Sequence, residues 1–480
     1  MPSFSDLTFD LTVAARSLAD RVADVANPTL RLGVTGLSRS GKTVFITALV
    51  HALRRQARLP VFRAAAQGRI TRASLAPQPD DAVPRFAFED HLAALTGDDR
   101  HWPASTSRIA ELRLEIAFES AAGWRSGSRM LTLDIVDYPG EWLLDLALLD
   151  KPFADWCRET LTACRSPHRA GVSAAFLEAL AGIDPKGPAD ETAARVLADR
   201  FRESLVAARQ EPLSFSALPP GRFLMPGDLQ GSPALTFAPV DLDGSAIPSG
   251  SFAAMMERRY ESYREHVVRP FFRDHFARLD RQIVLVDALA ALNAGPAAVA
   301  DLQAALEAVL SAFRTGRNSI LSSLFRPRID RVLFAATKAD HLHHTSHDRL
   351  EAVLELLVER ARARAAGLGA RVDTVALASV RATREVRLNE GRQALDAIVG
   401  TPLAGEVIAG ETFDGRAEAA VFPGELPDDP AAALNGTAAG VRFVRFRPPK
   451  VALASDGLPG PLPHIRLDRA LEFLAGDRLA

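Results

Sequence analysis

Eight consecutive residues near the start of the chain have the composition and spacing of a phosphate-binding loop. Residues 36–43 read Gly-Leu-Ser-Arg-Ser-Gly-Lys-Thr, which matches Gly-x-x-x-x-Gly-Lys-Thr. The glycines let the backbone curve around an anion, and a following helix directs the positive end of its dipole at it. The predicted nucleotide contacts are Gly36, Ser38, Arg39, Ser40, Gly41, Lys42, Thr43 and Val44.

Two residues of this loop have separate chemical roles. Lys42 is expected to place its charge on the β- and γ-phosphates, and the Thr43 hydroxyl is expected to ligate Mg²⁺. The 57 basic residues of the chain include only five lysines, so arginine serves wherever a generic cation suffices. A lysine at this position is therefore informative, and we predict a nucleoside triphosphate bound together with magnesium.

An acidic metal ligand, in addition to the Thr43 hydroxyl, is expected where the apolar strand pattern at 130–136 ends. Asp137-Tyr138-Pro139-Gly140 follows directly. Asp137 is predicted to hold the magnesium ion through a water molecule. The Gly140 N–H is predicted to bind the γ-phosphate and to respond to its loss.

A further metal ligand is expected just before the alternating strand pattern at 112–118. Thr106 is our candidate, because a threonine here can close over magnesium when a triphosphate is bound. Ser105 and Ser107 are rivals for this role. A loop or helix-capping function of Thr106 is the alternative interpretation.

Another group of residues is expected to recognise the base. Thr337 begins the segment Thr-Lys-Ala-Asp, which fits the [NT]-K-x-D pattern of guanine-binding enzymes. The Asp340 carboxylate can accept from N1–H and from the exocyclic amine of guanine, a donor pair that adenine lacks. Lys338 can lay its aliphatic stem along the base. A backbone N–H at Ser379 or Val380 is expected to read the guanine O6.

Strand and helix patterns alternate around these motifs. We therefore predict an α/β fold of the P-loop NTPase class, with a Ras-like mixed and mostly parallel sheet, a large helical insertion and a C-terminal extension that contains β-structure. The expected parts are an N-terminal helix at 1–29, a discontinuous nucleotide-binding domain at 30–144 and 281–400, the insertion at 145–280 and the extension at 401–480.

Four segments carry more local expectations. Residues 60–105 lack a clear period, which indicates a long loop with some helix. Residues 252–279 read as one long helix, and residues 441–447 as an alternating strand. Residues 6–26 form an amphipathic pattern that we expect to pack on the main domain, with attachment to a membrane surface as the alternative.

Composition excludes several classes of function. The formal net charge of −2 argues against a bulk basic surface for nucleic acid. No run of 18 apolar residues is present, so no membrane-spanning helix is expected. The N-terminal sequence lacks the pattern of a signal peptide, and we expect a cytoplasmic protein.

Three motifs resemble, in their order along the chain, those of the translation-factor and Ras-like class of GTPases. They are the segments 36–43, 137–140 and 337–340. More narrowly, the chain is similar to the YcjX-like family of bacterial P-loop proteins. The segments that carry this resemblance are 36–43, 137–146, 223–228 and 378–383. The resemblance implies binding of GTP or GDP with Mg²⁺ and a stress or envelope role with a membrane-protein partner. Peripheral attachment at the inner membrane and a nucleotide-dependent dimer are left open.

Two residues bear on catalysis, beside Lys42, Thr106 and Gly140. Glu141 follows Gly140 where Ras-like enzymes carry a water-orienting glutamine, and a carboxylate near a γ-phosphate is repelled. Arg39 stands where guanylate-binding proteins related to dynamin carry an arginine finger. We hypothesise that Arg39 supplies transition-state charge, with an exposed loop arginine as the alternative.

Three functions follow as alternatives. The leading one is a GTPase that hydrolyses GTP slowly and acts as a conformational switch. The second is an ATP-dependent ATPase or kinase, in which Asp340 would have no role. The third is a non-hydrolysing nucleotide-binding scaffold for a membrane protein, which Glu141 favours.

One cluster of histidines follows Asp340. It comprises His341, His343, His344 and His347. Zinc binding is one interpretation of the cluster. Its place on a loop beside the predicted base contact favours a solvated or capping role instead.

Overall fold

The computed structural model describes most of the chain. The described residues are 28–37, 39–104, 108–121, 127–167, 169–210, 219–224, 226, 229, 231–311, 329–367, 369–390, 393–408, 410–436 and 443–480. The chain divides into two compact units. The first lies within Met1–Tyr138, Leu279–Val299 and Arg328–Ala480. The second lies within Pro139–Arg278 and Ala300–Pro327. The helix expected at 6–26 lies outside the described residues, as do Ser38 and Thr106.

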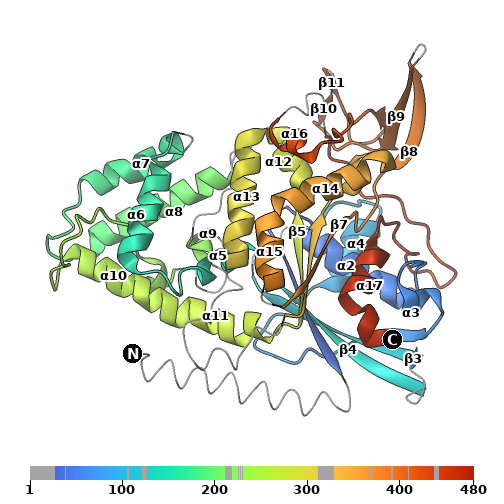
Figure 1. Ribbon diagram of the computed structural model, residues 1–480, viewed down its shortest axis with the longest axis horizontal. Helices are drawn as coiled ribbons and strands as arrows, with labels where there is room; N and C mark the ends of the chain where they lie inside the picture. The colour runs from blue at the N-terminus through green and yellow to red at the C-terminus, as the bar shows by residue number, and fades with distance from the viewer. Residues whose placement is uncertain are drawn as a thin grey trace. The chain divides into compact units, whose positions relative to one another are not determined.

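A seven-stranded sheet forms the centre of the first unit (Figure 1), in the order β2-β3-β4-β1-β5-β6-β7. The strands are β1 Thr29–Gly36, β2 Ile70–Ala76, β3 Ala110–Ser120, β4 Gly127–Asp137, β5 Arg281–Val286, β6 Arg331–Ala336 and β7 Arg371–Ala376. The five neighbours β4, β1, β5, β6 and β7 run parallel, whereas β3 is antiparallel to both β4 and β2. This mixed, mostly parallel sheet confirms the predicted fold class.

The first unit also contains helices, several of which pack on this sheet. They are α2 Lys42–Arg54, α3 Arg63–Ala66, α4 Phe88–Thr96, α12 Ala288–Ala294, α14 His347–Leu357, α15 Glu359–Gly367, α16 Pro430–Leu434 and α17 Leu467–Ala475, with the short turns η7 Ala339–His341, η8 His344–Ser346 and η9 Gly476–Leu479. Leu49 of α2 and Leu471 of α17 belong to one buried cluster with Leu32 of β1 and Leu333 of β6. Burial of these apolar stripes against the sheet provides the main driving force for folding of this unit.

The second unit is helical. Its elements are α5 Glu141–Leu146, α6 Phe153–Cys164, α7 Ala170–Ala181, α8 Glu191–Gln210, α9 Gly221–Leu224, η3 Pro233–Leu235, α10 Phe252–Tyr263, η4 Arg264–Val268, α11 Arg269–Asp274, η5 Phe276–Arg278 and most of α13 Pro296–Ser311. Aromatic rings fill its core: Trp156 stacks on Tyr260 with ring centroids 5.0 Å apart, and Phe237 contacts both rings. The structure thus confirms a large helical insertion.

The single helix expected at 252–279 is wrong in detail. The structure has α10, a π-helical turn at η4, then α11 and the short turn η5. Pro270 lies in the first turn of α11 and has no amide hydrogen to donate to the preceding turn. A wider π turn is a common way for a helix to absorb such an interruption.

The loop expected at 60–105 is also partly wrong, because it contains β2 between α3 and α4. Strand β2 pairs with β3 at the edge of the sheet, with Ser74 opposite Glu115. Only Ile70 of this strand is buried, with 9% of its surface exposed. An edge strand that buries so little has no alternating apolar pattern from which it could be recognised.

The C-terminal part adds short strands, of which those within 401–480 were predicted and the two within 384–400 were not. They are β8 Arg384–Glu390, β9 Gln393–Gly400, β10 Val407–Ile408, β11 Glu411–Thr412 and β12 Ala419–Val421. The strand expected at 441–447 is not formed by its described residues 443–447, where Phe446 makes only an isolated bridge to Pro402. Val444 and Phe446 instead pack in a small cluster with Ile398 and Val421, which accounts for the alternating pattern.

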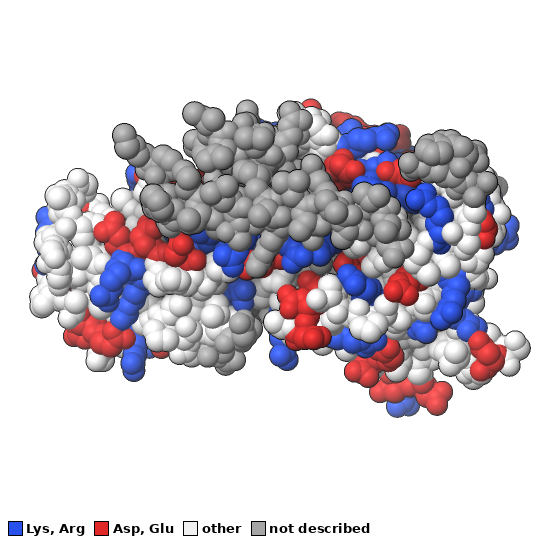
Figure 2. Space-filling model, turned by 90° about the horizontal axis from the view of Figure 1, so that it is seen from below, with Lys and Arg blue, Asp and Glu red and all other residues white. Residues whose placement is uncertain are grey.

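Basic and acidic side chains are interspersed on the face that Figure 2 shows, wherever the surface is described. Exposed ion pairs among the described residues include Arg200–Glu203, at 2.9 Å, and Arg165–Asp241, at 2.6 Å. Such pairs neutralise one another locally and each contributes little to stability.

Candidate functional site

The carboxyl ends of the parallel strands meet at one edge of the sheet. Val34 of β1 lies opposite Asp137 of β4, and Gly36 lies opposite Leu285 of β5. The last residue of β6, Ala336, is likewise in register with the last residues of β5 and β7. Ligands of open α/β sheets bind at this edge. The phosphate, metal and base motifs of the first unit all begin here.

The phosphate loop is a tight turn between β1 and α2. The Ser40 amide donates to the Leu37 carbonyl at 3.1 Å, and Arg39 and Gly41 adopt left-handed φ angles of 66° and 90°. Gly41 precedes α2 and offers no side-chain cap, and the first helical turn contains no acidic residue. The leading amides of α2 therefore form a positively polarised end without a competing carboxylate.

Gly36 is required by close packing. A Cβ atom at this position would lie 2.4 Å from the Leu285 carbonyl oxygen and 2.4 Å from Ser40 Oγ. The first of these atoms belongs to the backbone of β5 and cannot move without disturbing the sheet. The sequence predicted a glycine for close approach to phosphate, and the structure adds close approach to a neighbouring strand.

The two chemically distinct loop residues are both buried. Lys42 Nζ donates to the Gly36 carbonyl at 2.9 Å, so the ammonium lies inside the curve of the loop. Thr43 follows at the start of α2, and its carbonyl accepts from Thr47 Oγ1 at 2.8 Å. Arg39 is exposed at the tip of the turn, and Val44 is half-buried one residue into the helix.

Asp137 ends β4 with no exposed surface, one strand away from the phosphate loop. The next residue, Tyr138, is fully buried and accepts from Gln282 Nε2 at 2.8 Å through its hydroxyl oxygen. Burial raises the pKa of Tyr138 well above its usual value, with the neighbouring Asp137 charge adding to the shift. Tyr138 is thus a neutral packing residue, and Gln282 is a partner that the sequence did not reveal.

Gly140 and Glu141 belong to the second unit, where they begin α5. Gly140 has right-handed helical angles, φ −61° and ψ −27°, and its carbonyl accepts from the Leu143 amide at 3.1 Å. Backbone conformation alone would therefore admit other residue types at Gly140. Glu141 is buried.

The Thr-Lys-Ala-Asp segment leaves β6 through a left-handed residue, Lys338, with φ 62°. The Thr337 amide donates to the Val286 carbonyl at 2.9 Å, which fixes the segment beside β5. Lys338 Nζ forms an ion pair with Asp287, the residue that follows β5 and caps α12. Asp287 is thus a member of the site to which sequence reasoning gave no role.

Asp340 connects two loops through hydrogen bonds. Its Oδ2 accepts from the Ala382 amide at 2.8 Å, and its carbonyl accepts from Thr383 Oγ1 at 2.5 Å. The Ala339 amide also donates to the Leu377 carbonyl at 3.1 Å. The structure therefore brings the segment at 337–340 against the segment at 377–383, which holds Ser379 and Val380. Ala382 and Thr383 are contacts whose role the sequence did not indicate.

The histidines that follow Asp340 are mostly buried. The predicted role was either solvated or capping, and the solvated alternative is wrong for His341, His343 and His347, which are 9%, 6% and 5% exposed. His341 packs edge-on against Phe446, and its burial lowers its pKa. Only His344 is largely exposed.

The parallel sheet, the glycine-rich turn and the lysine at the start of α2 together define a nucleotide-binding fold of the P-loop class. Within that class, the model of the YcjX-like family, DUF463, matches residues 30–479. The chain belongs to the YcjX-like family.

Two curated relatives are similar along nearly their whole length. One is a protein of Escherichia coli strain K12 named Ras-like GTPase YcjX, 40% identical over 467 residues that cover 94% of this chain and 96% of the relative. The other, of the same name, comes from Shewanella oneidensis and is 34% identical over 490 residues, covering 98% of each chain. Among the described residues, no helix combines the length and apolar character needed to cross a membrane.

Proposed function

We propose that this protein binds GTP and GDP with Mg²⁺ and hydrolyses GTP slowly, as a conformational switch. The observation that carries the proposal is that two features of a nucleotide site lie at the same edge of the sheet. One is the loop with Lys42 inside its curve, and the other is the Asp340 carboxylate held against the segment at 377–383. The name of the two relatives, Ras-like GTPase, supports the same function.

The roles that we propose for the phosphate and metal residues come from their sequence motifs. Lys42 would neutralise the β- and γ-phosphates, with the amides of the loop as further donors. Thr43 would ligate magnesium directly, and Asp137 would hold it through water from the end of β4. Thr106 would close over the metal, and Gly140 would respond to the γ-phosphate.

Guanine selectivity would come from Asp340. One carboxylate oxygen accepts from Ala382, and a carboxylate offers about four acceptor positions in all, so further donors can be accommodated. Lys338, steadied by Asp287, would lie along the base. The backbone of Ser379 or Val380 would donate to O6.

A titration with GDP, GTP and ATP analogues in the presence of magnesium tests this function. We expect heat of binding for the guanine nucleotides and little for ATP. Asp340→Asn should lower GDP affinity by at least about tenfold and favour xanthosine diphosphate, because the amide reverses one donor–acceptor pair. Asp99→Asn, at an exposed loop position, is the control. Equal binding of ATP and GTP would instead support the ATP-dependent alternative.

A non-hydrolysing scaffold is the second candidate, and the place of Glu141 favours it. A carboxylate follows Gly140 where a water-orienting glutamine would serve hydrolysis. Single-turnover measurement of GTP cleavage separates the two functions. Phosphate release above the uncatalysed rate, lost in Lys42→Ala, supports the switch.

The cellular setting is a separate part of the proposal. On the family resemblance, we place the protein in the cytoplasm, docked peripherally at the inner membrane on a membrane-protein partner in a stress or envelope response. Fractionation of cells before and after envelope stress tests this setting. Recovery in the soluble fraction under both conditions, without a cross-linked membrane protein, would argue against it.

A further inference from the structure

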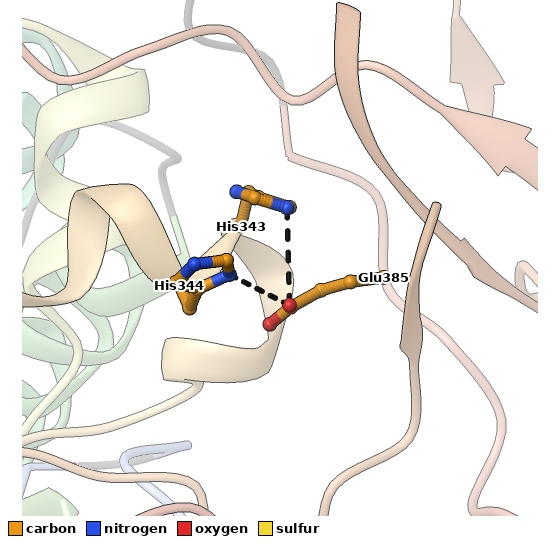
Figure 3. Close-up of side chains that lie close together, drawn as sticks. All are labelled: His343, His344 and Glu385. Atoms are coloured by element: carbon orange, nitrogen blue, oxygen red, sulfur yellow. Dashed lines mark hydrogen bonds and ion pairs between the residues drawn. The ribbon is translucent and has the colours of Figure 1, made fainter. Parts of the chain in front are cut away.

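Two histidines and a glutamate converge beside the Asp340 loop. His343 and His344 lie at the start of η8, and Glu385 lies on β8 (Figure 3). His344 Nδ1 is 2.7 Å from Glu385 Oε2, and His343 Nε2 is 3.8 Å from the same oxygen. Each residue offers one possible ligand atom, and these three atoms all lie within 4.8 Å of one another.

These separations suit a small transition-metal ion. Zinc bonds of about 2.0–2.2 Å in tetrahedral geometry place neighbouring donor atoms roughly 3.3–3.6 Å apart. The two separations in the structure, 2.7 Å and 3.8 Å, lie on either side of that range. Two imidazoles and one carboxylate are a known donor set for zinc, with water in the fourth position. Hard cations such as Mg²⁺ and Ca²⁺ prefer oxygen-only sets.

Neighbouring residues would orient the first ligand. The His343 side chain is 8% exposed, and its other nitrogen, Nδ1, lies 3.5 Å from Asp396 Oδ2 and 3.0 Å from Thr345 Oγ1. A carboxylate on the distal nitrogen of a ligating histidine fixes its tautomer and raises its basicity. Asp396 comes from β9, so two adjacent strands and the η8 turn would hold the ring.

The carboxylates also face arginine. Arg381 Nη2 lies 3.3 Å from Glu385 Oε1, and Arg387 Nε lies 3.3 Å from Asp396 Oδ1. In each pair the arginine lies near one carboxylate oxygen. The other oxygen of Glu385 lies near both histidines, and the other oxygen of Asp396 lies near His343. The arginines therefore reduce the local negative charge but leave Glu385 Oε2 directed at both imidazoles.

We infer that His343, His344 and Glu385 form a zinc-binding site, with Asp396 as the positioning residue for His343. His343 follows Asp340 by three residues, and Glu385 follows Thr383 by two. Bound zinc would therefore clamp together the two segments that Asp340 already joins. This role, but not the metal site itself, rests on the proposed function, because it predicts slower release of guanine nucleotide.

The test is direct titration of the chelator-treated full chain with zinc, without nucleotide, by calorimetry and by metal analysis after dialysis. We expect one equivalent of zinc, and visible absorption bands of a four-coordinate site when cobalt replaces it. His344→Ala and Glu385→Gln should each weaken binding by at least about 100-fold, and Asp396→Asn by about tenfold. His101→Ala, an exposed histidine elsewhere in the first unit, should change nothing.

The conservative Glu385→Gln variant keeps the test valid if His344→Ala disturbs the fold, which circular dichroism would reveal. Zinc uptake by the wild type no greater than by the Glu385→Gln variant overturns the site and leaves a histidine–carboxylate hydrogen bond only. Release of a fluorescent GDP analogue, timed with and without zinc, then tests the clamp. Unchanged release from a zinc-loaded chain overturns the clamp, whereas failure of GDP to bind at all counts against the nucleotide function.

Discussion

The Lys338 ammonium and the Asp287 carboxylate form an ion pair across the carboxyl ends of β6 and β5. Asp287 is 8% exposed and also caps α12 by accepting from the Ala290 amide at 3.2 Å. One acidic side chain thus starts a helix and steadies the lysine that we place along the base.

Asp287→Asn should separate these two roles. Asparagine retains a capping oxygen but loses the charge, so we expect little change in stability and roughly 2- to 5-fold weaker GDP binding. Asp287→Ala should cost about 1 kcal/mol more in the free energy of unfolding, since the cap is lost as well. Chemical denaturation and GDP titration measure the two effects, with Glu159→Gln at an exposed ion pair as control. Equal GDP affinity in wild type and Asp287→Asn would remove Asp287 from the site.

Gly36→Ala should damage the phosphate loop. The added methyl group would sit 2.4 Å from the Leu285 carbonyl oxygen, so β1 or the loop must shift. We expect a loss of about 1–3 kcal/mol in stability and at least tenfold weaker GTP binding. Gly171→Ala in α7 is the matched control, because nothing lies within 4 Å of its Cβ position. The control should be neutral or stabilising by about 0.5–1 kcal/mol.

Arg39→Ala tests the arginine finger. Arg39 is exposed and left-handed at the tip of the loop, where its side chain is not committed to packing. If it supplies transition-state charge, turnover should fall by about 10³-fold or more while GTP affinity changes little. Single-turnover hydrolysis, compared with Lys42→Ala, decides the question. Full turnover in Arg39→Ala would leave Arg39 as a solvent-exposed loop residue.

The pH dependence of stability should carry a signature of Asp145 in the helical unit. Its carboxylate accepts from the Gly221 amide at 2.6 Å and from the Tyr263 hydroxyl at 2.6 Å. Burial raises the pKa of Asp145 to about 6, against which these hydrogen bonds act. Because the folded pKa exceeds the ordinary value of 3.8, the folded state binds more protons between these values.

The resulting contribution is fully present below about pH 4 and is lost as the pH rises through about 6. Its size is about 3 kcal/mol in the free energy of unfolding. Asp145→Asn should remove this slope, which urea denaturation followed by tryptophan fluorescence would report, since Trp142 and Trp156 of the helical unit contribute to the signal. An identical slope in the variant would show that other groups dominate this pH range.

The sequence predicted the parts of the site that depend on local pattern. The phosphate loop and the Thr-Lys-Ala-Asp segment each follow an apolar strand, and parallel strands bring their carboxyl ends to one edge. Asp287 and Ala382 were not predictable in the same way. They contact Lys338 and Asp340 from 51 and 42 residues away in the chain, so only the tertiary fold assigns them a function.

The fold was least predictable where burial is slight or where packing imitates a strand. Strand β2 buries little and therefore leaves no periodic signal, and the alternation at Val444 and Phe446 reflects a small cluster without a strand ladder. In the segment 252–279 the helical period is strong on both sides of Pro270. Periodicity alone does not show where a helix changes its winding.

The bond between Asp340 and Ala382 has an evolutionary consequence. A single carboxylate anchors the segment at 382–383 and, in the proposed function, also recognises the base. A lineage could not exchange its nucleotide preference at position 340 without also disturbing a loop some forty residues downstream. Such a change would be tolerated only alongside compensating replacements. Substitutions in the two segments are therefore expected to be strongly epistatic and to have arisen together.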